Sequence, residues 1–440
     1  MNNRLSWRNS LFIGSMLFGL FFGAGNLIFP VFLGQQAGHN VGLAVFGFLL
    51  TGIGLPLLGV AGMGLTRSNS VFELSEHVNR PFAYIFTLLL YLTIGPFFAT
   101  PRLATTSFQM GVSPFIPLVH HRLVLAIFSV VFFATAWWFA RKPSKLMTYV
   151  GKWLTPIFLI LLGILIVTAL VKPMGDFSAL PQGMYKKSPV LTGFTEGYNT
   201  MDALASLVFG VVVIDSIKDL GITKPAQIAK ETIKSGAISI VLMGILYSLL
   251  AIIGTMSLGK LHLAENGGTT LAQVFNYYFG SVGSLLLALI VIIACLKTAI
   301  GLISSFGDSM TEMFPGTNYQ LMIGVASVVS CVIANLGLTN LIKYSTPVLM
   351  FIYPLAIVLI LLAVLSPILG TSKWLYGITL LFTIVPAIFA GIENLPKNLQ
   401  IHSILTINQL LPFSSMGLGW IIPALIGLIV GYILSKLNHI

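Results

Sequence analysis

The sequence predicts an all-α protein that crosses a membrane about twelve times. Hydrophobic residues make up 56% of the 440 residues, and charged residues make up only 8%. Soluble domains carry about 25% charged residues, and the mean hydropathy of this chain is +0.96. A membrane-spanning helix needs about 20 predominantly apolar residues, and about twelve such segments follow one another. The expected fold class is therefore a polytopic helical membrane protein.

Short polar loops separate the predicted spans. The spans cover residues 10–33, 40–64, 81–110, 122–140, 146–171, 195–216, 233–258, 281–306, 320–338, 341–365, 374–392 and 418–435. The longest early loop covers residues 172–194. Residues 270–279, inside a later loop, fit a short amphipathic helix outside the membrane as well as they fit an ordered connector. Residues 1–9 are basic and lead directly into a span, so we expect no removable signal peptide.

The positive charges predict the orientation of the chain, because lysine and arginine favour cytoplasmic loops. With a cytoplasmic N-terminus, thirteen of them fall in cytoplasmic segments and six in external segments. We therefore expect both termini in the cytoplasm, as an even number of spans requires. This bias also accounts for the net charge of +11, so no nucleic acid partner is expected. Cys295 and Cys331 lie in apolar runs without metal-ligand spacing, and they imply no disulfide.

The residue patterns do not predict an enzyme. The sequence has no nucleophile–base pattern, no phosphate-binding glycine loop and no metal spacing. A channel would need a continuous polar pore, whereas polar residues in these spans are isolated. A transporter surrounded by membrane lipid fits better, and we expect neither a cofactor nor an obligatory protein partner.

The first span contains a stretch that does not fit an uninterrupted helix. Gly19, Gly23 and Gly25 fall within seven residues, Asn26 follows, and Pro30 closes the stretch. Glycine costs about 1 kcal/mol relative to alanine inside a helix, and hydrocarbon tolerates a broken helix only where it is buried or lines a cavity. A break would offer carbonyls to a cation and N–H groups to an anion. For Gly19 and Gly23 alone, close helix packing is an equally good interpretation.

The sixth span repeats this pattern, as two inverted five-span halves would require. The run Leu207–Gly210 (LVFG) is similar to Leu20–Gly23 (LFFG). Asp202, Ser206 and Gly210 are four residues apart and share one helical face. An acid inside an apolar segment is a functional candidate. Asp202 fits a contact with a substrate ammonium or a coupling proton, but it also fits a position near the outer interface.

The eighth span carries possible oxygen ligands for a small hard cation such as Na⁺. These are Gly301, which leaves its carbonyl accessible, and the hydroxyls of Ser304 and Ser305. The alternative is that both serines bond back to their own helix. Lys297 fits an ammonium that replaces a bound cation, or one that reaches to an interface. Arg102 in the third span fits a gate or a helix ion pair.

Four runs carry a resemblance to a known family. They are Phe22–Pro30 (FGAGNLIFP), Gly95–Arg102 (GPFFATPR), Gly197–Ala205 (GYNTMDALA) and Thr298–Leu302 (TAIGL). Together they resemble the branched-chain amino acid:cation symporter family, bacterial carriers of leucine, isoleucine and valine, over essentially the whole chain. The resemblance implies a LeuT-like fold of the amino acid–polyamine–organocation superfamily. Its parts would be a five-helix repeat at 1–171, an external loop at 172–194, a second inverted five-helix repeat at 195–365 and two additional C-terminal helices at 366–440.

The resemblance also implies an activity and a set of site residues. The activity would be symport of branched-chain amino acids with a cation, Na⁺ favoured, across a bacterial plasma membrane. The alternative is a proton-coupled or broader-specificity amino acid transporter of the same fold. N–H groups at Gly23, Ala24, Gly25 and Asn26 would bind the substrate carboxylate, and Asp202, Ala205, Ser206, Phe209 and Gly210 would surround the rest of the substrate. The cation ligands would be Gly19, Phe22, Gly301, Ser304 and Ser305, with Lys297 and Asp202 as coupling candidates.

Overall fold

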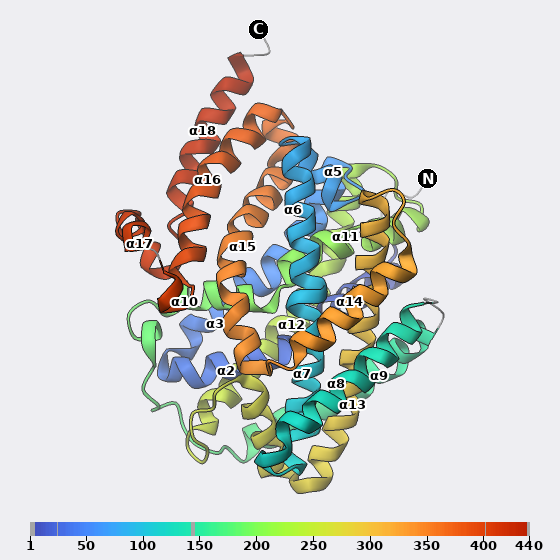
Figure 1. The fold of residues 1–440 in the computed structure, drawn as a ribbon, viewed down its shortest axis with the longest axis vertical. Helices are drawn as coiled ribbons and strands as arrows, with labels where there is room; N and C mark the ends of the chain where they lie inside the picture. The colour runs from blue at the N-terminus through green and yellow to red at the C-terminus, as the bar shows by residue number, and fades with distance from the viewer. Residues whose placement is uncertain (1–4, 24, 142–145, 401, 438–440) are drawn as a thin grey trace.

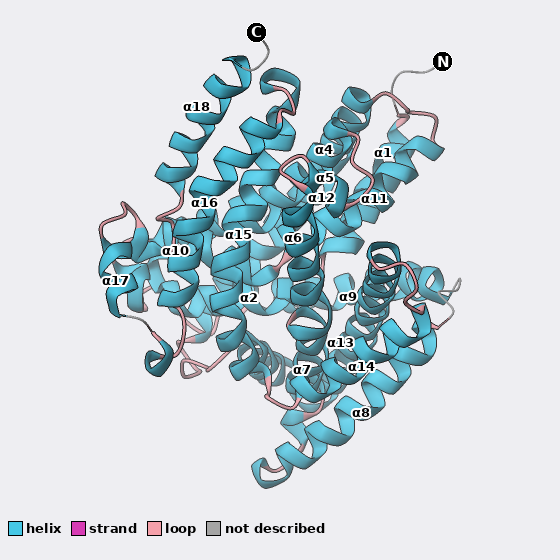
Figure 2. Cartoon of the chain, turned by 45° about the horizontal axis from the view of Figure 1, so that its top comes forward, coloured by secondary structure: helices cyan, strands magenta, loops and turns pink. Residues whose placement is uncertain are grey.

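The chain folds into a bundle made only of helices. A computed structural model describes residues 5–23, 25–141, 146–400 and 402–437. This described part contains no strand (Figure 2), so the predicted all-α fold class is confirmed. The first and last described helices reach the same end of the molecule (Figure 1).

The first half of the chain follows the predicted spans closely. Its helices are α1 (Trp7–Phe21), α2 (Gly25–Ala37), α3 (Val41–Leu49), α4 (Leu55–Thr66), α5 (Val71–Glu76), α6 (Arg80–Leu92), α7 (Ala99–Gly111), α8 (His121–Ala140) and α9 (Leu146–Val171). Short 3₁₀ and π segments connect them: η1 (Gly38–Asn40), η2 (Leu50–Gly54), η3 (Thr93–Phe97), η4 (Ser113–Phe115) and η5 (Leu118–His120). Polar side chains cap the first turns of several helices. For example, Oδ1 of Asn79 accepts a hydrogen bond from the N–H of Phe82 at the start of α6.

The second half contains longer helices. They are α10 (Pro189–Glu196), α11 (Asp202–Asp219), α12 (Pro225–Ser257), α13 (Gly267–Met313), α14 (Tyr319–Ala334), α15 (Leu338–Leu369), α16 (Lys373–Glu393), α17 (His402–Gln409) and α18 (Ile421–Leu437), with η6 (Gly183–Lys186), η7 (Gly197–Thr200), η8 (Lys397–Leu399) and η9 (Ser414–Met416) between them. α13 is interrupted at Gly280, whose φ of 59° is not helical. Residues 267–279 therefore form a short helix of their own, which is one of the two interpretations that the sequence left open at 270–279.

The structure does not confirm the number of spans. Within the described residues, seven helical segments are long and apolar enough to cross a membrane, or eight if the bent pair α10–η7 and α11 counts as one. Other predicted spans are shorter apolar helices, among them α14 and α18. The first predicted span is divided into α1, of 15 residues, and α2, of 13 residues.

Two predicted loops are shorter in the structure. α10 begins at Pro189, inside the loop expected at 172–194 and before the second repeat expected from residue 195. α12 begins at Pro225, eight residues before the predicted start at Ile233. Proline suits the first turn of a helix because its missing N–H would have no intrahelical acceptor there. Hydropathy detects apolar residues rather than helix starts, so it places both starts too late.

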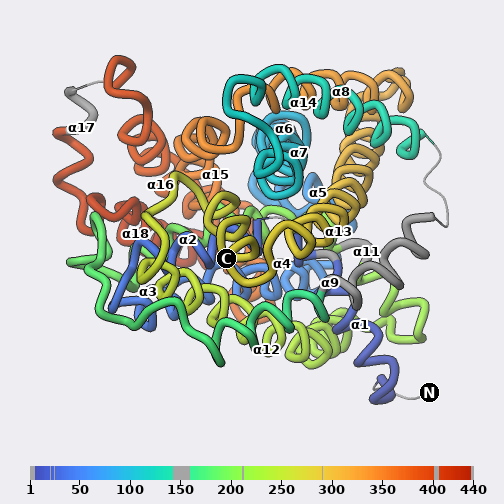
Figure 3. The backbone as a smooth tube through the Cα atoms, turned by 90° about the horizontal axis from the view of Figure 1, so that it is seen from below, coloured from blue at the N-terminus to red at the C-terminus, as the bar shows by residue number. Residues whose placement is uncertain are grey.

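The core of the bundle forms around α12, which packs against α1, α2 and α4. A Cβ atom on Gly34 of α2 would overlap the carbonyl of Ala251 in α12, and one on Gly254 would overlap the carbonyl of Val31. These small residues let the two backbones approach closely, as in many membrane helix pairs. α16 packs against α15 and α18 at the edge of the bundle (Figure 3), so the two C-terminal helices lie away from the centre.

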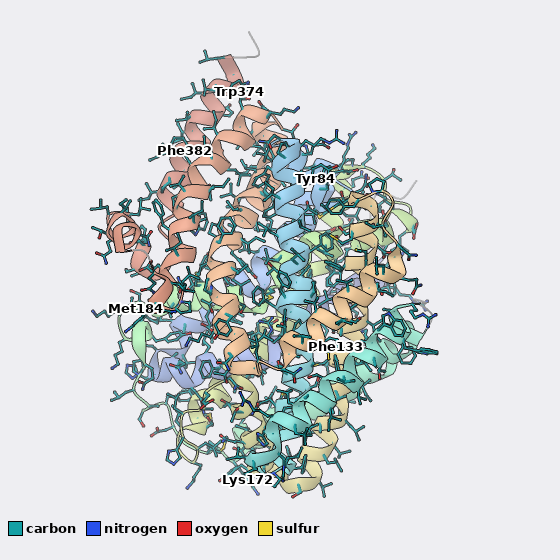
Figure 4. All side chains as sticks on the ribbon, in the orientation of Figure 1. Tyr84, Phe133, Lys172, Met184, Trp374 and Phe382 are labelled. Atoms are coloured by element: carbon teal, nitrogen blue, oxygen red, sulfur yellow. The ribbon has the colours of Figure 1, made fainter. Side chains whose placement is uncertain are left out.

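Three labelled residues show at which end of the molecule some of the predicted loops lie. Tyr84 on α6 and Trp374 at the start of α16 lie toward one end, and Lys172 lies toward the other (Figure 4). Two segments expected on the cytoplasmic side, next to Tyr84 and Trp374, thus lie at one end, opposite the start of the expected external loop.

Candidate functional site

The first span is broken where the sequence predicted a break. α1 ends at Phe21, Phe22 has an extended ψ of 91°, and α2 begins at Gly25. The N–H of Asn26 donates to the carbonyl of Gly23 at 3.2 Å. Gly25 is the first residue of α2, so its own N–H has no acceptor within that helix. Ala24 lies outside the described residues.

The helix beginning at Pro189 is broken as well. α10 runs into the 3₁₀ turn η7, Met201 adopts a left-handed φ of 62°, and α11 starts at Asp202. The two parts meet at 46°. A positive φ is unusual for a residue with a side chain, and such backbone conformations gather at functional sites. The Thr200 hydroxyl accepts the N–H of Asp202 at 3.3 Å and so satisfies one donor at the start of α11.

Asn26 connects the two breaks. Its Nδ2 donates to the carbonyl of Phe21 at 2.7 Å and to the carboxylate of Asp202 at 2.8 Å, and it also contacts the hydroxyl of Tyr247 on α12. All three polar side chains, Asn26, Asp202 and Tyr247, are buried. An amide nitrogen has two N–H groups, and the Tyr247 hydroxyl also bonds to the Asp202 carboxylate. Asp202 therefore lies inside the bundle in a polar network, not near an interface.

Arg102 of α7 reaches the same place from a third segment. Its Nη1 donates to the carbonyl of Asn199 at 2.6 Å, and its Nη2 donates to that of Thr200 at 3.5 Å. The guanidinium carbon lies 5.0 Å from the ring centre of Phe29 on α2, within the range of a cation–π contact. Arg102 thus supplies donors to carbonyls that the end of η7 leaves open. From the sequence, Arg102 was expected to serve a gate or a helix ion pair, and its place between the two breaks was not predicted.

A cavity of about 50 Å³ lies where these segments meet. It is lined by six of the predicted substrate residues: Gly23, Gly25, Asn26, Asp202, Ala205 and Phe209. Its other lining residues are Phe21, Ile94, Ala99, Arg102, Leu103, Thr200, Met201, Thr298 and Leu302. The wall is thus polar at the two breaks and apolar on the side of α7 and α13.

Two predicted substrate residues lie outside this cavity. The hydroxyl of Ser206 donates to the carbonyl of Ala203 at 2.7 Å, and the side chain packs against Gly59 of α4. Gly210 lies on the same face of α11, where a Cβ would come within 2.8 Å of the sulfur of Met63. This face of α11 packs against α4, because serine and glycine allow the two helices to approach closely.

The sequence did not predict that the apolar residues Ile94, Ala99 and Leu103 belong to the cavity wall. They lie around η3, where Gly95 has a ψ of −117° and interrupts the helix between α6 and α7. The glycines and prolines of the run Gly95–Arg102 indicated an interruption, but hydropathy does not say which apolar side chains of a span turn inward.

The predicted cation ligands come from two helices. Gly19 and Phe22 belong to the end of α1, and Gly301, Ser304 and Ser305 belong to α13. The structure packs α1 against α11 and α12, whereas α13 packs mainly against α7, α9 and α14. The two halves of the predicted site therefore do not form a packed helix pair. Ser304 is buried, and its hydroxyl interacts with that of Tyr319 without forming a hydrogen bond of ordinary geometry.

A second and larger cavity of about 590 Å³ lies among α5, α6, α11 and α13. It contains Ser305 and reaches Leu207 and Val208 of α11. Its charged lining residues are Glu73, Glu76, Arg80, Asp308 and Glu312. α5 lies at the end of the molecule that carries both termini (Figure 1), so this cavity belongs to that end.

Lys297, a coupling candidate, lies on α13 and is partly buried. In the described part of the chain, the ion pairs within 4.0 Å are Lys218–Asp215 and Lys234–Glu231. Lys297 thus makes no such pair there. Its neighbour Thr298 lines the smaller cavity, whereas Lys297 does not.

Comparisons of the sequence agree with the expected family. The family described as branched-chain amino acid transport protein matches residues 6–438. The branched-chain amino acid permease BrnQ of Lactobacillus delbrueckii subsp. lactis is 44% identical over 427 residues, which are 96% of this chain and 96% of the permease. BrnQ of Bacillus subtilis is 43% identical over 99% of this chain and 98% of its own length. The branched-chain amino acid transport system 2 carrier protein of Pseudomonas aeruginosa is 36% identical over 97% of this chain and 96% of its own length.

Comparisons of the structure show the fold. The inward-facing conformation of Mhp1 superposes with a TM-score of 0.60 at 13% identity and covers 96% of this chain and 91% of Mhp1. A closed conformation of Mhp1, a nucleobase-cation-symport-1 family transporter with bromovinylhydantoin bound, gives a TM-score of 0.60 at 12% identity and covers 97% of this chain and 92% of Mhp1. The chain thus has the LeuT-like fold of Mhp1.

Proposed function

Because this chain belongs to the family of branched-chain amino acid transport proteins, we propose that it imports leucine, isoleucine and valine by symport with a cation, Na⁺ favoured. The family consists of transporters and not of enzymes. The observation that carries the proposal is the cavity at the meeting point of two broken helices, lined by polar groups on one side and apolar side chains on the other.

The polar side of the cavity suits an amino acid because an amino acid is a zwitterion that is costly to strip of water. The start of α2 offers N–H groups to a carboxylate, as helix N-termini do. Asp202 lines the same cavity and offers a carboxylate to the ammonium group. Groups held in place by the fold replace water on both charged ends of the substrate.

The apolar side of the cavity suits a branched aliphatic side chain. Ile94, Leu103, Phe209 and Leu302 contribute to this wall, and an apolar wall rejects charged side chains because burying them unpaired is costly. The cavity of about 50 Å³ has room for a few water molecules. Binding of leucine would therefore require the surrounding helices to move apart, as alternating access demands.

The cation would bind between the end of α1 and α13, at Gly19, Phe22, Gly301, Ser304 and Ser305. The hydroxyl of Ser304 is buried and makes no hydrogen bond of ordinary geometry, which supports an oxygen ligand there. α1 and α13 do not pack against each other in this conformation, so a cation that contacts both would favour a conformation in which they approach. Only such differential binding can shift a conformational equilibrium. Protonation of Lys297 or Asp202 is the alternative route of coupling.

The chain is a multi-pass membrane protein, and its positive charges support an orientation with both termini in the cytoplasm of a bacterium. The larger cavity lies at the end with both termini. In this orientation it opens toward the cytoplasm and reaches Ser305, which supports a role as the release route for cation and substrate.

Counterflow in proteoliposomes tests the proposal. Vesicles loaded with unlabelled leucine should accumulate labelled leucine, and isoleucine and valine should compete. Replacing Na⁺ by Li⁺ or choline, or imposing a pH gradient instead, identifies the coupling ion. Accumulation that follows only the pH gradient would refute Na⁺ coupling, and an absence of leucine counterflow would refute the substrate class.

A further inference from the structure

Arg102 is a buried cation that contacts no carboxylate directly in the described part of the chain. Its side chain is 4% exposed, and the ion pairs within 4.0 Å in that part do not include it. A guanidinium carries five N–H donors. The carbonyls of Asn199 and Thr200 accept from two of them. Arg102 also lines the smaller cavity, so a bound molecule would come next to a positive charge that no carboxylate contacts directly.

This arrangement is unfavourable without a ligand. Removing a charge from water costs several kcal/mol unless it is paired or well hydrogen-bonded, and two carbonyls supply only partial charges. Asp202 attracts the guanidinium across the same cavity. It lies beyond 4.0 Å and is bonded to Asn26 and Tyr247, so it neutralises Arg102 only in part. An anion in the cavity would complete the coordination of the guanidinium, because arginine binds carboxylates through two parallel hydrogen bonds.

The backbone donors expected for the substrate carboxylate are partly occupied. The N–H of Asn26 bonds to Gly23, and the side chain of Asn26 bonds to Phe21 and Asp202. The N–H of Gly25, the first residue of α2, has no acceptor within that helix and is available to a ligand. A Cβ atom on Gly25 would lie 3.4 Å from Nη2 of Arg102. Glycine at this position therefore lets the guanidinium lie directly beside the start of α2, where a carboxylate can reach both.

We propose that Arg102 binds the α-carboxylate of the transported amino acid, together with the backbone at the start of α2, while Asp202 faces the ammonium group. This inference rests on the proposed function and adds a substrate contact to it. The two carbonyls of Asn199 and Thr200 hold the guanidinium toward the cavity. The site then recognises both charges of a zwitterion through a cation and an anion supplied by different helices.

The test compares leucine with leucinamide, which keeps the ammonium group and the side chain but lacks the carboxylate. Affinities are measured by competition with labelled leucine on purified protein in nanodiscs. The wild type should prefer leucine by about 100-fold, the value of a charge-assisted hydrogen-bonded pair. Arg102→Gln should weaken leucine binding by about 100-fold and leave leucinamide binding within about threefold of the wild-type value. The preference for leucine over leucinamide should then nearly disappear.

Arg102→Lys keeps a cation and a donor for the carbonyl of Asn199, so it retains a contact with the second break even if Arg102→Gln does not fold. Lysine lacks the two parallel donors of arginine, and the preference for leucine should still fall by about tenfold. Arg141→Gln is the matched control, because Arg141 contacts Trp137 and Trp138 at the end of α8 and does not line the smaller cavity. This variant should prefer leucine over leucinamide as strongly as the wild type does.

The inference is overturned if both Arg102 variants weaken leucine and leucinamide equally, because Arg102 would then only hold the second break together. That result leaves the proposed function intact. If the wild type itself does not bind leucine, the proposed function fails, and the inference fails with it.

Discussion

Asn26 of α2 donates through Nδ2 to the carboxylate of Asp202 on α11 at 2.8 Å, although the two residues are 176 positions apart in the sequence. The same amide donates to the last residue of α1, Phe21. One buried side chain therefore satisfies the end of one broken helix and contacts the start of the other. Members of a buried polar network depend on one another, so the two breaks should respond together to mutation.

Asn26→Ala and Asp202→Ala should have strongly non-additive effects on leucine binding. Each change removes the shared bond and leaves a buried partner unsatisfied, which costs about 1–3 kcal/mol. The double variant loses that bond only once, so a double-mutant cycle on leucine affinity should give an interaction energy of about 1–3 kcal/mol. Asn26→Ala combined with Thr383→Ala, in the peripheral helix α16, is the control and should be additive within about 0.5 kcal/mol. Additivity of the Asn26–Asp202 pair would show that the bond does not couple the breaks.

Asp202→Asn should reduce the affinity for leucine more than the affinity for 4-methylpentanoate, which is leucine without its amino group. The substitution keeps the size of the side chain but removes the charge that faces the ammonium. Loss of one charge-assisted contact should weaken leucine binding by about 10–100-fold, and the deaminated analogue should bind nearly as before. Competition binding measures both. Equal loss for the two ligands would mean that Asp202 holds the breaks but does not contact the amino group.

Ser305→Ala should raise the Na⁺ concentration needed for half-maximal leucine uptake by about fivefold, the value of one lost oxygen ligand of about 1 kcal/mol. The leucine requirement at saturating Na⁺ should change less. Ser304→Ala should act in the same direction, because the buried Ser304 hydroxyl makes no hydrogen bond of ordinary geometry in this conformation. Ser327→Ala on α14, whose hydroxyl bonds to its own helix at 2.7 Å, is the control. Unchanged Na⁺ requirements in both variants would place the cation elsewhere.

The break in the first span could be predicted because its cause is local. Three glycines close together, followed by asparagine and proline, disfavour a continuous helix whatever surrounds them. The break after η7 was harder to foresee, since Met201 has a left-handed φ without being glycine, and only the surrounding structure can hold it so. The amphipathic pattern at 270–279 is also a local property, and it left a short helix and an ordered connector equally open; the structure has the helix.

The contacts between distant residues could not be predicted from the sequence. Nothing near Arg102 indicates that it meets the carbonyls of Asn199 and Thr200, because that contact depends on how α7 packs in the bundle. The same holds for Ser206, which the spacing grouped with Asp202 but which packs against Gly59. Helical periodicity shows which residues share a face, and it does not show whether that face meets a cavity or another helix.

The orientation of the chain can be tested with single cysteines in a variant whose Cys295 and Cys331 are replaced by alanine. Glu76 is the last residue of α5, at the end with both termini (Figure 1), and Lys172 lies at the opposite end (Figure 4). Both positions are exposed. A membrane-impermeant maleimide should label Lys172→Cys in intact bacteria and Glu76→Cys only after permeabilisation, because the excess of positive charges places the terminal end in the cytoplasm. The reverse labelling pattern would invert the orientation, and with it the direction in which the larger cavity opens.

Gly254→Ala should destabilise the protein, whereas Gly244→Ala on the same helix should not. A Cβ on Gly254 would overlap the carbonyl of Val31, which belongs to the backbone of α2 and has no rotamer to adjust. Such overpacking costs about 1–3 kcal/mol and would push α2, with its N–H groups at the cavity, away from α12. A Cβ on Gly244 meets no atom within 4 Å, and alanine is favoured over glycine in a helix by about 1 kcal/mol. Thermal unfolding in detergent should therefore give a lower Tm for Gly254→Ala and an equal or higher Tm for Gly244→Ala. Equal Tm values for both variants would contradict this prediction, because they would mean that α2 can move away from α12 at little cost in stability.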